Sequence, residues 1–119
     1  MTQVPGFLMI NRFVCNTTNE LVGADDVKGV MGAFRFNIGK FSKGDDRELN
    51  MSWMVPDGET LLRIIESDLI GDDEIGTIDL TQNLDQETTT NVQGQGTNYD
   101  ITYTVTSTTV DSPASDTGN

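Results

Sequence analysis

Short apolar runs alternate with polar, turn-forming stretches along the chain, and this pattern predicts β-strands. The alternation is clearest in residues 99–105, where aromatic and aliphatic side chains occupy every second position and polar ones lie between them. Other runs with strand character are residues 7–15, 30–38, 49–55, 61–65 and 75–80. Residues 24–34 are the best helix candidate, but their two glycines oppose a helix.

Turn-forming residues separate these runs. Gly, Asp and Asn are concentrated in residues 42–48, 56–59 and 93–98. The sequence VPDGET (residues 55–60) predicts a hairpin between the strands that flank it, whereas the polar residues 81–92 predict a long loop or a weak edge strand. Short strands joined by short turns predict an all-β fold, an antiparallel β-sandwich of about six to eight strands.

The length of 119 residues predicts one domain, which we place at residues 1–105. From residue 106 onward the chain is rich in Ser, Thr and Asp and has too little apolar content to offset the entropy cost of ordering it. We therefore expect residues 106–119 to form a flexible tail. No secretory leader or membrane-spanning stretch is recognisable, which predicts a cytoplasmic location by default. Asn16 and Asn50 begin glycosylation-type triplets, but without a sign of secretion these triplets do not predict glycosylation.

The formal net charge of −12, from 19 acidic and 7 basic residues, argues against binding to nucleic acid. It also opposes direct contact with an anionic membrane, unless a divalent cation neutralises the surface. A surface adapted to solubility or salt explains the charge equally well.

Histidine is absent and Cys15 is the single cysteine, so no internal disulfide, Ser-His-Asp triad or Cys-His pair exists. We considered Glu66 and Asp68 as paired carboxylates acting on a glycan. The small size leaves little room for a substrate cleft, and we expect a protein that is not an enzyme.

Acidic residues crowd the stretch that follows the aliphatic run 61–65. Glu66 and Asp68 lie two positions apart, so both side chains can leave one face of a strand, and Asp73 follows after a short loop. Three neighbouring carboxylates repel one another, and a hard cation removes that cost. Calcium, which accepts six to eight oxygen ligands, fits such a loop better than magnesium.

A second acidic stretch follows the first strand. It places Asn19, Glu20, Asp25 and Asp26 around Gly23. If the first strand and the strand at 61–65 are neighbours in the sandwich, both loops leave from one end, and their oxygens converge on one site. Asp26 and Asp72 are further candidates, as auxiliary ligands or through their carbonyl groups.

On these two loops the chain resembles the C2 domain family. Asn19 and Asp25 have the spacing of the acidic pair in the family's first calcium-binding loop, and Glu66, Asp68, Asp73 and Gly76 follow the pattern of its third loop. Asn19 and Glu66 depart from the family's usual Asp, and the third loop is one residue shorter. The resemblance implies a β-sandwich that binds calcium through Asn19, Asp25, Glu66, Asp68 and Asp73.

Aliphatic residues occupy the tips of both acidic loops: Leu21 and Val22 in the first, Leu69 and Ile70 in the second. Exposed aliphatic tips suggest an interaction surface, and burying each such side chain contributes about 1.5–3 kcal/mol. The alternative is that these side chains fold back and close the end of the sandwich.

The sequence therefore predicts a calcium-responsive, C2-like module that docks onto phospholipid or a protein partner. The alternative is a metal-independent acidic sandwich that serves as a structural or assembly subunit, with a homo-oligomer as one form of that assembly.

Overall fold

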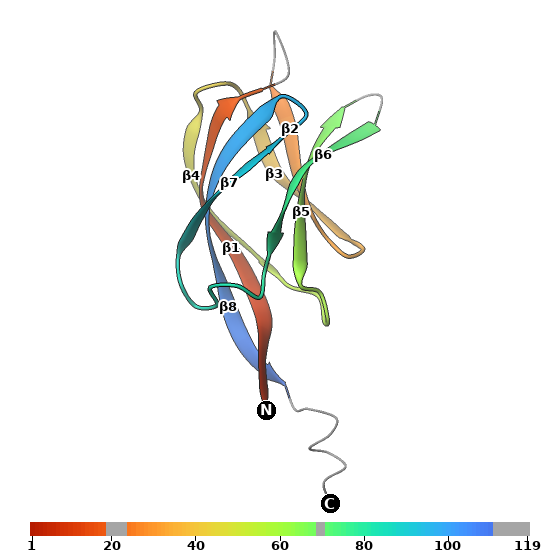
Figure 1. The fold of residues 1–119 in the computed structure, drawn as a ribbon, viewed down its shortest axis with the longest axis vertical. Helices are drawn as coiled ribbons and strands as arrows, with labels where there is room; N and C mark the ends of the chain where they lie inside the picture. The colour runs from red at the N-terminus through yellow and green to blue at the C-terminus, as the bar shows by residue number, and fades with distance from the viewer. Residues whose placement is uncertain (19–23, 69–70, 111–119) are drawn as a thin grey trace, which may run out of the picture.

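The structure, a computed structural model, describes residues 1–18, 24–68 and 71–110. Its described part is built of strands and turns without a helix, and Figure 1 shows the strands as two facing layers. The eight strands are β1 (Thr2–Thr17), β2 (Asp25–Met31), β3 (Phe34–Phe41), β4 (Asp46–Met54), β5 (Leu61–Asp68), β6 (Gly71–Asp79), β7 (Thr88–Gly94) and β8 (Thr97–Val110). This confirms the predicted all-β antiparallel sandwich.

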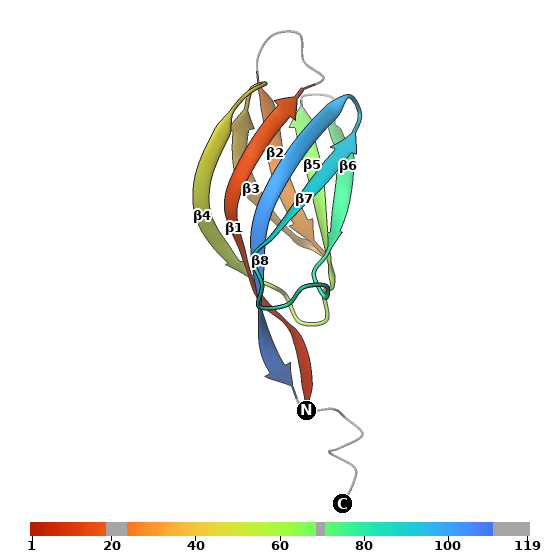
Figure 2. The same cartoon turned by 60° about the vertical axis from the view of Figure 1, so that its left-hand side comes forward.

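Each layer is a four-stranded antiparallel sheet. Sheet A has the strand order β4-β1-β8-β7, and sheet B has the order β3-β2-β5-β6. The first and last strands of the chain are the two central strands of sheet A, paired from Thr2↔Val110 to Thr17↔Asn98. Figure 2 shows this pair running the whole length of the molecule and continuing past the other strands.

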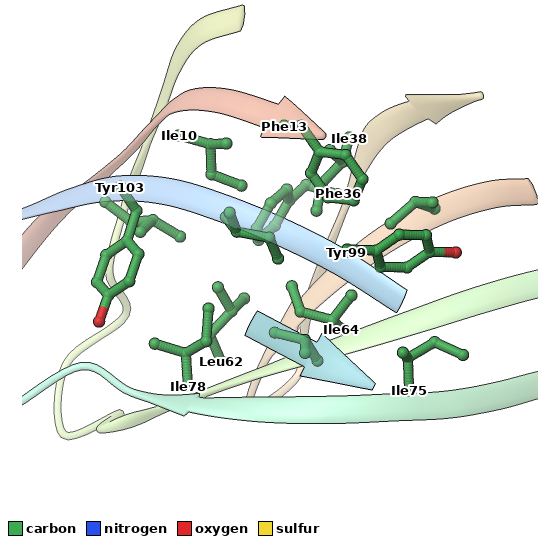
Figure 3. Close-up of a cluster of buried hydrophobic side chains, with 14 of the residues drawn as sticks. Ile10, Phe13, Phe36, Ile38, Leu62, Ile64, Ile75, Ile78, Tyr99 and Tyr103 are labelled. Atoms are coloured by element: carbon green, nitrogen blue, oxygen red, sulfur yellow. The ribbon is translucent and has the colours of Figure 1, made fainter. Parts of the chain in front are cut away.

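The core fills the space between the sheets, because alternate side chains of each strand point inward. In β8 the inward residues Tyr99, Ile101, Tyr103 and Val105 are buried, as the alternation in residues 99–105 predicts. Figure 3 shows such side chains from both sheets meeting in one apolar layer. The buried cluster also includes Leu8, Ile10, Phe13, Val27, Phe36, Leu62, Ile64, Ile75 and Ile78.

Aromatic rings join the two sheets along the side where the edge strands β3 and β4 face each other. Phe36 of β3 stacks on Trp53 of β4, with 4.1 Å between the ring centroids. Phe34 stacks on the outer side of Phe36 at 5.5 Å and is 40% exposed, whereas Phe36 is 7% exposed. Side chains therefore join the sheets here, where the described strands have no β3–β4 ladder.

Two local predictions are wrong. Residues 30–38 are not one strand, because the chain turns at Gly32 and Ala33 and divides the run between β2 and β3. Gly32 has φ +63°, a conformation that costs a residue with a side chain about 1 kcal/mol or more. Residues 55–60 do turn, but they connect β4 of sheet A to β5 of sheet B and so do not form a hairpin. The helix candidate at residues 24–34 consists of β2 and the turn that follows it.

Two further elements differ in extent from the sequence prediction. Residues 88–94 of the expected loop form β7, an edge strand of sheet A, which agrees with the second of the two alternatives. Strand β8 continues to Val110, five residues into the expected tail, because Thr2, Gln3, Val4 and Pro5 of β1 pair with that segment. Residues 111–119 lie outside the described part of the chain.

Helices long and apolar enough to cross a membrane are absent from the described residues.

Candidate functional site at the acidic pole

Strand register brings the described residues of the two predicted acidic stretches to the same end of sheet B. β2 begins at Asp25 and β5 ends at Asp68, and their antiparallel pairing matches Asp26 with Ser67 and Val27 with Glu66. We call this end, with the start of β6, the acidic pole. We expected the two acidic stretches to converge if the first strand and the strand at 61–65 were neighbours. These strands, β1 and β5, lie in different sheets and do not pair. The neighbour of β5 is instead β2, the strand that follows the first acidic stretch.

Three of the predicted ligands share one face at the acidic pole. Residues directly opposite each other in a ladder point to the same face, and Glu66 lies opposite both Val27 of β2 and Asp73 of β6. Val27 belongs to the core, so this face is the inner one. Asp25, two residues before Val27, also points inward and is completely buried.

Asp25 links the two sheets. The Tyr99 hydroxyl of β8 donates a hydrogen bond to Asp25 Oδ2 over 2.6 Å. Burial and the neighbouring Asp25 carboxylate raise the pKa of Tyr99 above its ordinary value, so the phenol stays protonated and remains a donor. The same two causes, burial first, raise the pKa of the nearby Cys15 thiol to about 11. Asp25 is therefore held inside the sandwich by a structural partner.

Glu66 is 2% exposed and Asp73 is half-buried. Placing ionised carboxylates away from water is costly unless neighbouring charges or hydrogen bonds stabilise them. Their side-chain oxygens are the ligand type that hard cations such as calcium accept. The described residues by themselves do not include three His, Cys, Asp or Glu side chains grouped tightly enough to hold a metal ion.

Asp26 and Asp72, the two auxiliary candidates, occupy the positions next to inward-facing residues and so lie on the outer face of sheet B. Arg35 donates to both oxygens of Asp72, at 2.7 and 2.9 Å, and Lys28 Nζ lies 3.9 Å from Asp26 Oδ1. The Arg35 hydrogen bond lowers the pKa of Asp72 to about 2. Cations of this chain therefore neutralise these two carboxylates on the outer face of sheet B.

Several predicted site residues lie outside the described part of the chain. These are Asn19, Leu21, Val22, Leu69 and Ile70, and for Asp68 the structure describes only the backbone, at the end of β5. The residues that flank these two gaps are described. Residues 19–23 lie between Thr18 and Ala24, which adjoin the end of β1 and the start of β2. Residues 69–70 lie between Asp68, the last residue of β5, and Gly71, the first residue of β6.

A polar network on the outer face of sheet A, at the same end, has no counterpart in the sequence prediction. Asn16 donates to Asn98 and Asp100, each at 3.0 Å, and Asn91 donates to the same two residues at 2.7 and 2.8 Å. These donors lower the pKa of Asp100. The sequence signals this network only through the polar positions Asn98 and Asp100, which alternate with the inward residues of β8. Its partners come from three strands, so no local pattern predicts it.

Comparison with known proteins supports the fold. No family model matches the sequence, and no curated protein matches it. A solved structure described as the structure of a C2 domain superposes with a TM-score of 0.51 and 15% sequence identity. The superposition covers 87% of this chain and 99% of that chain. At this identity the similarity establishes the fold alone: the chain has a C2-like β-sandwich.

Proposed function

We propose that this C2-like chain is a calcium-responsive binding module that docks through its acidic pole. The candidate ligands are Asn19, Asp25, Glu66, Asp68 and Asp73, and the aliphatic residues Leu21, Val22, Leu69 and Ile70 are the candidate docking surface. The observation that carries the proposal is the β2–β5–β6 register, which lines up Asp25, Glu66 and Asp73 on one inner face.

The proposed mechanism is an electrostatic switch. The net charge of −12 repels anionic surfaces, and the acidic pole concentrates part of that charge at one end of the molecule. Bound calcium neutralises the inward carboxylates and lets the neighbouring aliphatic side chains enter phospholipid or a protein surface. Each aliphatic side chain that is buried contributes about 1.5–3 kcal/mol, so four are sufficient to matter for docking.

A metal-independent sandwich is the second candidate, and one observation favours it. Asp25 already has a structural role, because it accepts the Tyr99 hydrogen bond within the core. In this alternative the acidic pole stabilises the contact between the sheets and keeps the surface soluble, and the chain serves as a structural or assembly subunit.

Calorimetric titration separates the two candidates. We expect calcium at up to millimolar concentration to release or absorb heat with the wild-type chain and to raise its melting temperature. The Asp68→Asn/Asp73→Asn double variant should lose most of both effects. Asp57→Asn/Glu87→Gln is the matched control, because it removes two exposed carboxylates outside the acidic pole and should respond as the wild type does.

Docking is tested by sedimentation with vesicles of phosphatidylserine and phosphatidylcholine, with calcium and with a chelator. Leu69→Ser/Ile70→Ser should still bind calcium in the titration but should sediment less with vesicles. Equal heats and equal melting temperatures with and without calcium rule out the calcium site. Binding of calcium without any sedimentation rules out the phospholipid surface and leaves a protein partner.

A further inference from the structure

An apolar groove lies at the end of the sandwich opposite the acidic pole. Its volume is about 530 Å³, and its lining includes residues 3–7 of β1 and most of residues 54–60, which leave β4. Thr108 and Val110 of β8 complete one side. We call it the basal groove, and Figures 1 and 2 show the N-terminus and the end of β8 at this end of the molecule.

The groove follows a free edge of sheet A. β1 pairs with β8 from Thr2 onward, but its pairing with β4 begins only at Phe7, opposite Met54. The last contact on that side is the hydrogen bond from the Val55 amide to the Gly6 carbonyl, at 2.9 Å. Within the described chain, residues 2–5 therefore have a strand on one side only. Alternate residues of a strand direct their amide and carbonyl groups to the same side, so part of this backbone points away from β8, and Gln3, Val4 and Pro5 line the groove.

The walls combine exposed apolar side chains with negative charge. Phe7, Met54 and Val110 line the groove and are 49%, 68% and 45% exposed. Asp57 and Glu59 also line it, and neither forms an ion pair with any residue that the structure describes. The Glu59 carboxylate lies beside Gly32, at the turn between β2 and β3. Lysine and arginine are absent from the lining.

We propose that the basal groove binds an extended, cationic segment of a partner protein, which adds a strand to the free edge of β1. The free backbone specifies an extended peptide, because main-chain hydrogen bonds give such a segment its affinity. The apolar side chains of the peptide contact Phe7, Met54 and Val110. Asp57 and Glu59 favour lysine or arginine at the peptide positions between those apolar residues.

Charge excludes two other occupants. A second copy of this chain carries the same net charge of −12 and would bring two pairs of Asp57 and Glu59 together. The last nine residues of the chain contain Asp111 and Asp116 and no cation, so they do not complement the groove. The inference is independent of calcium binding, because the groove and the acidic pole lie at opposite ends.

Selection from a phage-displayed library of random dodecapeptides on the immobilised full chain tests the peptide chemistry. We expect the selected peptides to alternate apolar residues with lysine or arginine. Synthetic copies of the selected peptides should bind the full chain, as measured by fluorescence anisotropy. Met54→Lys and Asp57→Asn/Glu59→Gln should each weaken this binding at least about tenfold. Because both variants act through charge, added salt should also weaken the binding of the wild type. The matched controls Met51→Lys and Glu87→Gln, outside the groove, should bind as the wild type does.

N-methylated copies of the best peptide test the added strand. One copy is methylated at the odd-numbered amides and the other at the even-numbered amides. Because only alternate amides of an added strand face β1, one copy should lose binding and the other should keep it.

Four outcomes would overturn the proposal. They are a selection without enrichment, selected peptides that are acidic, binding that the groove variants leave unchanged, and equal effects of the two methylation patterns. Light scattering that reveals a dimer, broken by Met54→Lys but not by Met51→Lys, would assign the groove to a second copy and would also overturn it.

Discussion

Tyr99 and Asp25, 74 residues apart in the chain, meet inside the acidic pole through a 2.6 Å hydrogen bond. The bond joins β8 of sheet A to β2 of sheet B at the acidic pole. It therefore positions one candidate calcium ligand whether or not a cation is present. We therefore expect the stability of the acidic pole, and the calcium binding that we propose for it, to depend on this pair.

Removal of the Tyr99 hydroxyl should destabilise the protein. In Tyr99→Phe the buried Asp25 carboxylate loses a donor, and we expect the free energy of unfolding to fall by about 1–3 kcal/mol. Chemical denaturation followed by circular dichroism measures this loss. Tyr103→Phe is the matched control, because Tyr103 is equally buried on the same strand and its hydroxyl has no hydrogen bond within the described chain. A loss of the same size in both variants would contradict a specific role for the Tyr99–Asp25 bond.

The aromatic stack between β3 and β4 should hold the two sheets together on that side. Phe36→Ala removes a ring that is 7% exposed, so we expect a loss of about 3–5 kcal/mol in the free energy of unfolding. Trp53, the only tryptophan, stacks on Phe36, so its fluorescence emission should move to longer wavelength. Phe34→Ala, at a position that is 40% exposed, should cost less than about 1 kcal/mol and leave the emission nearly unchanged.

Arg35 should set the titration of Asp72. The pKa of Asp72 is lowered to about 2, so carboxyl resonances in NMR should place its midpoint there. In Arg35→Gln the midpoint should rise toward the ordinary value of about 4. Arg63→Gln is the control, because Arg63 pairs with Glu74 on the same sheet and should leave the Asp72 midpoint in place.

The sign of the effect on stability follows from the same shift. Because the folded pKa of Asp72 lies below the unfolded one, its contribution is fully present above about pH 4 and is lost as the pH falls toward 2. The difference in melting temperature between the wild type and Arg35→Gln should therefore shrink over that interval. A difference that stays constant down to pH 2 would show that the pair contributes nothing to stability.

Cys15 should be unreactive in the folded protein. Its side chain is completely buried and its pKa is raised to about 11, so little thiolate exists at neutral pH and reagents cannot reach it. We expect colour development with Ellman's reagent to be slow in buffer and complete within the mixing time in denaturant. Equally fast reaction under both conditions would mean that the end of β1 opens readily.

The fold was predictable from the sequence where one face of a strand is buried. The alternation in residues 99–105 identified β8, because each inward position is apolar and each outward one is polar. The run at residues 30–38 led to the wrong prediction of a single strand, because its alternation continues through Gly32 and Ala33, where the chain turns. Local sequence at residues 55–60 identified a turn but carried no information about which sheet receives the next strand.

The candidate site was predictable in part, for a related reason. Charge clusters at strand ends pointed to Asp25, Glu66 and Asp73, and strand register places these three on one face. The pairing of Asp72 with Arg35 depends on the outer-face neighbours of β2 and β3, which a single sequence does not specify. The Tyr99–Asp25 hydrogen bond joins the two sheets between residues that are 74 positions apart in the sequence, so no local sequence pattern predicts it.

The pairing of β1 with β8 also constrains the order of folding. Sheet B uses only residues 25–79, so its strands can pair as soon as that middle portion has left the ribosome. The two central strands of sheet A are the first and last of the chain, and a contact such as Thr2↔Val110 requires closing a loop almost as long as the domain. We therefore expect sheet B to form first during synthesis, and the nascent chain to keep the inner face of sheet B uncovered until translation reaches β8.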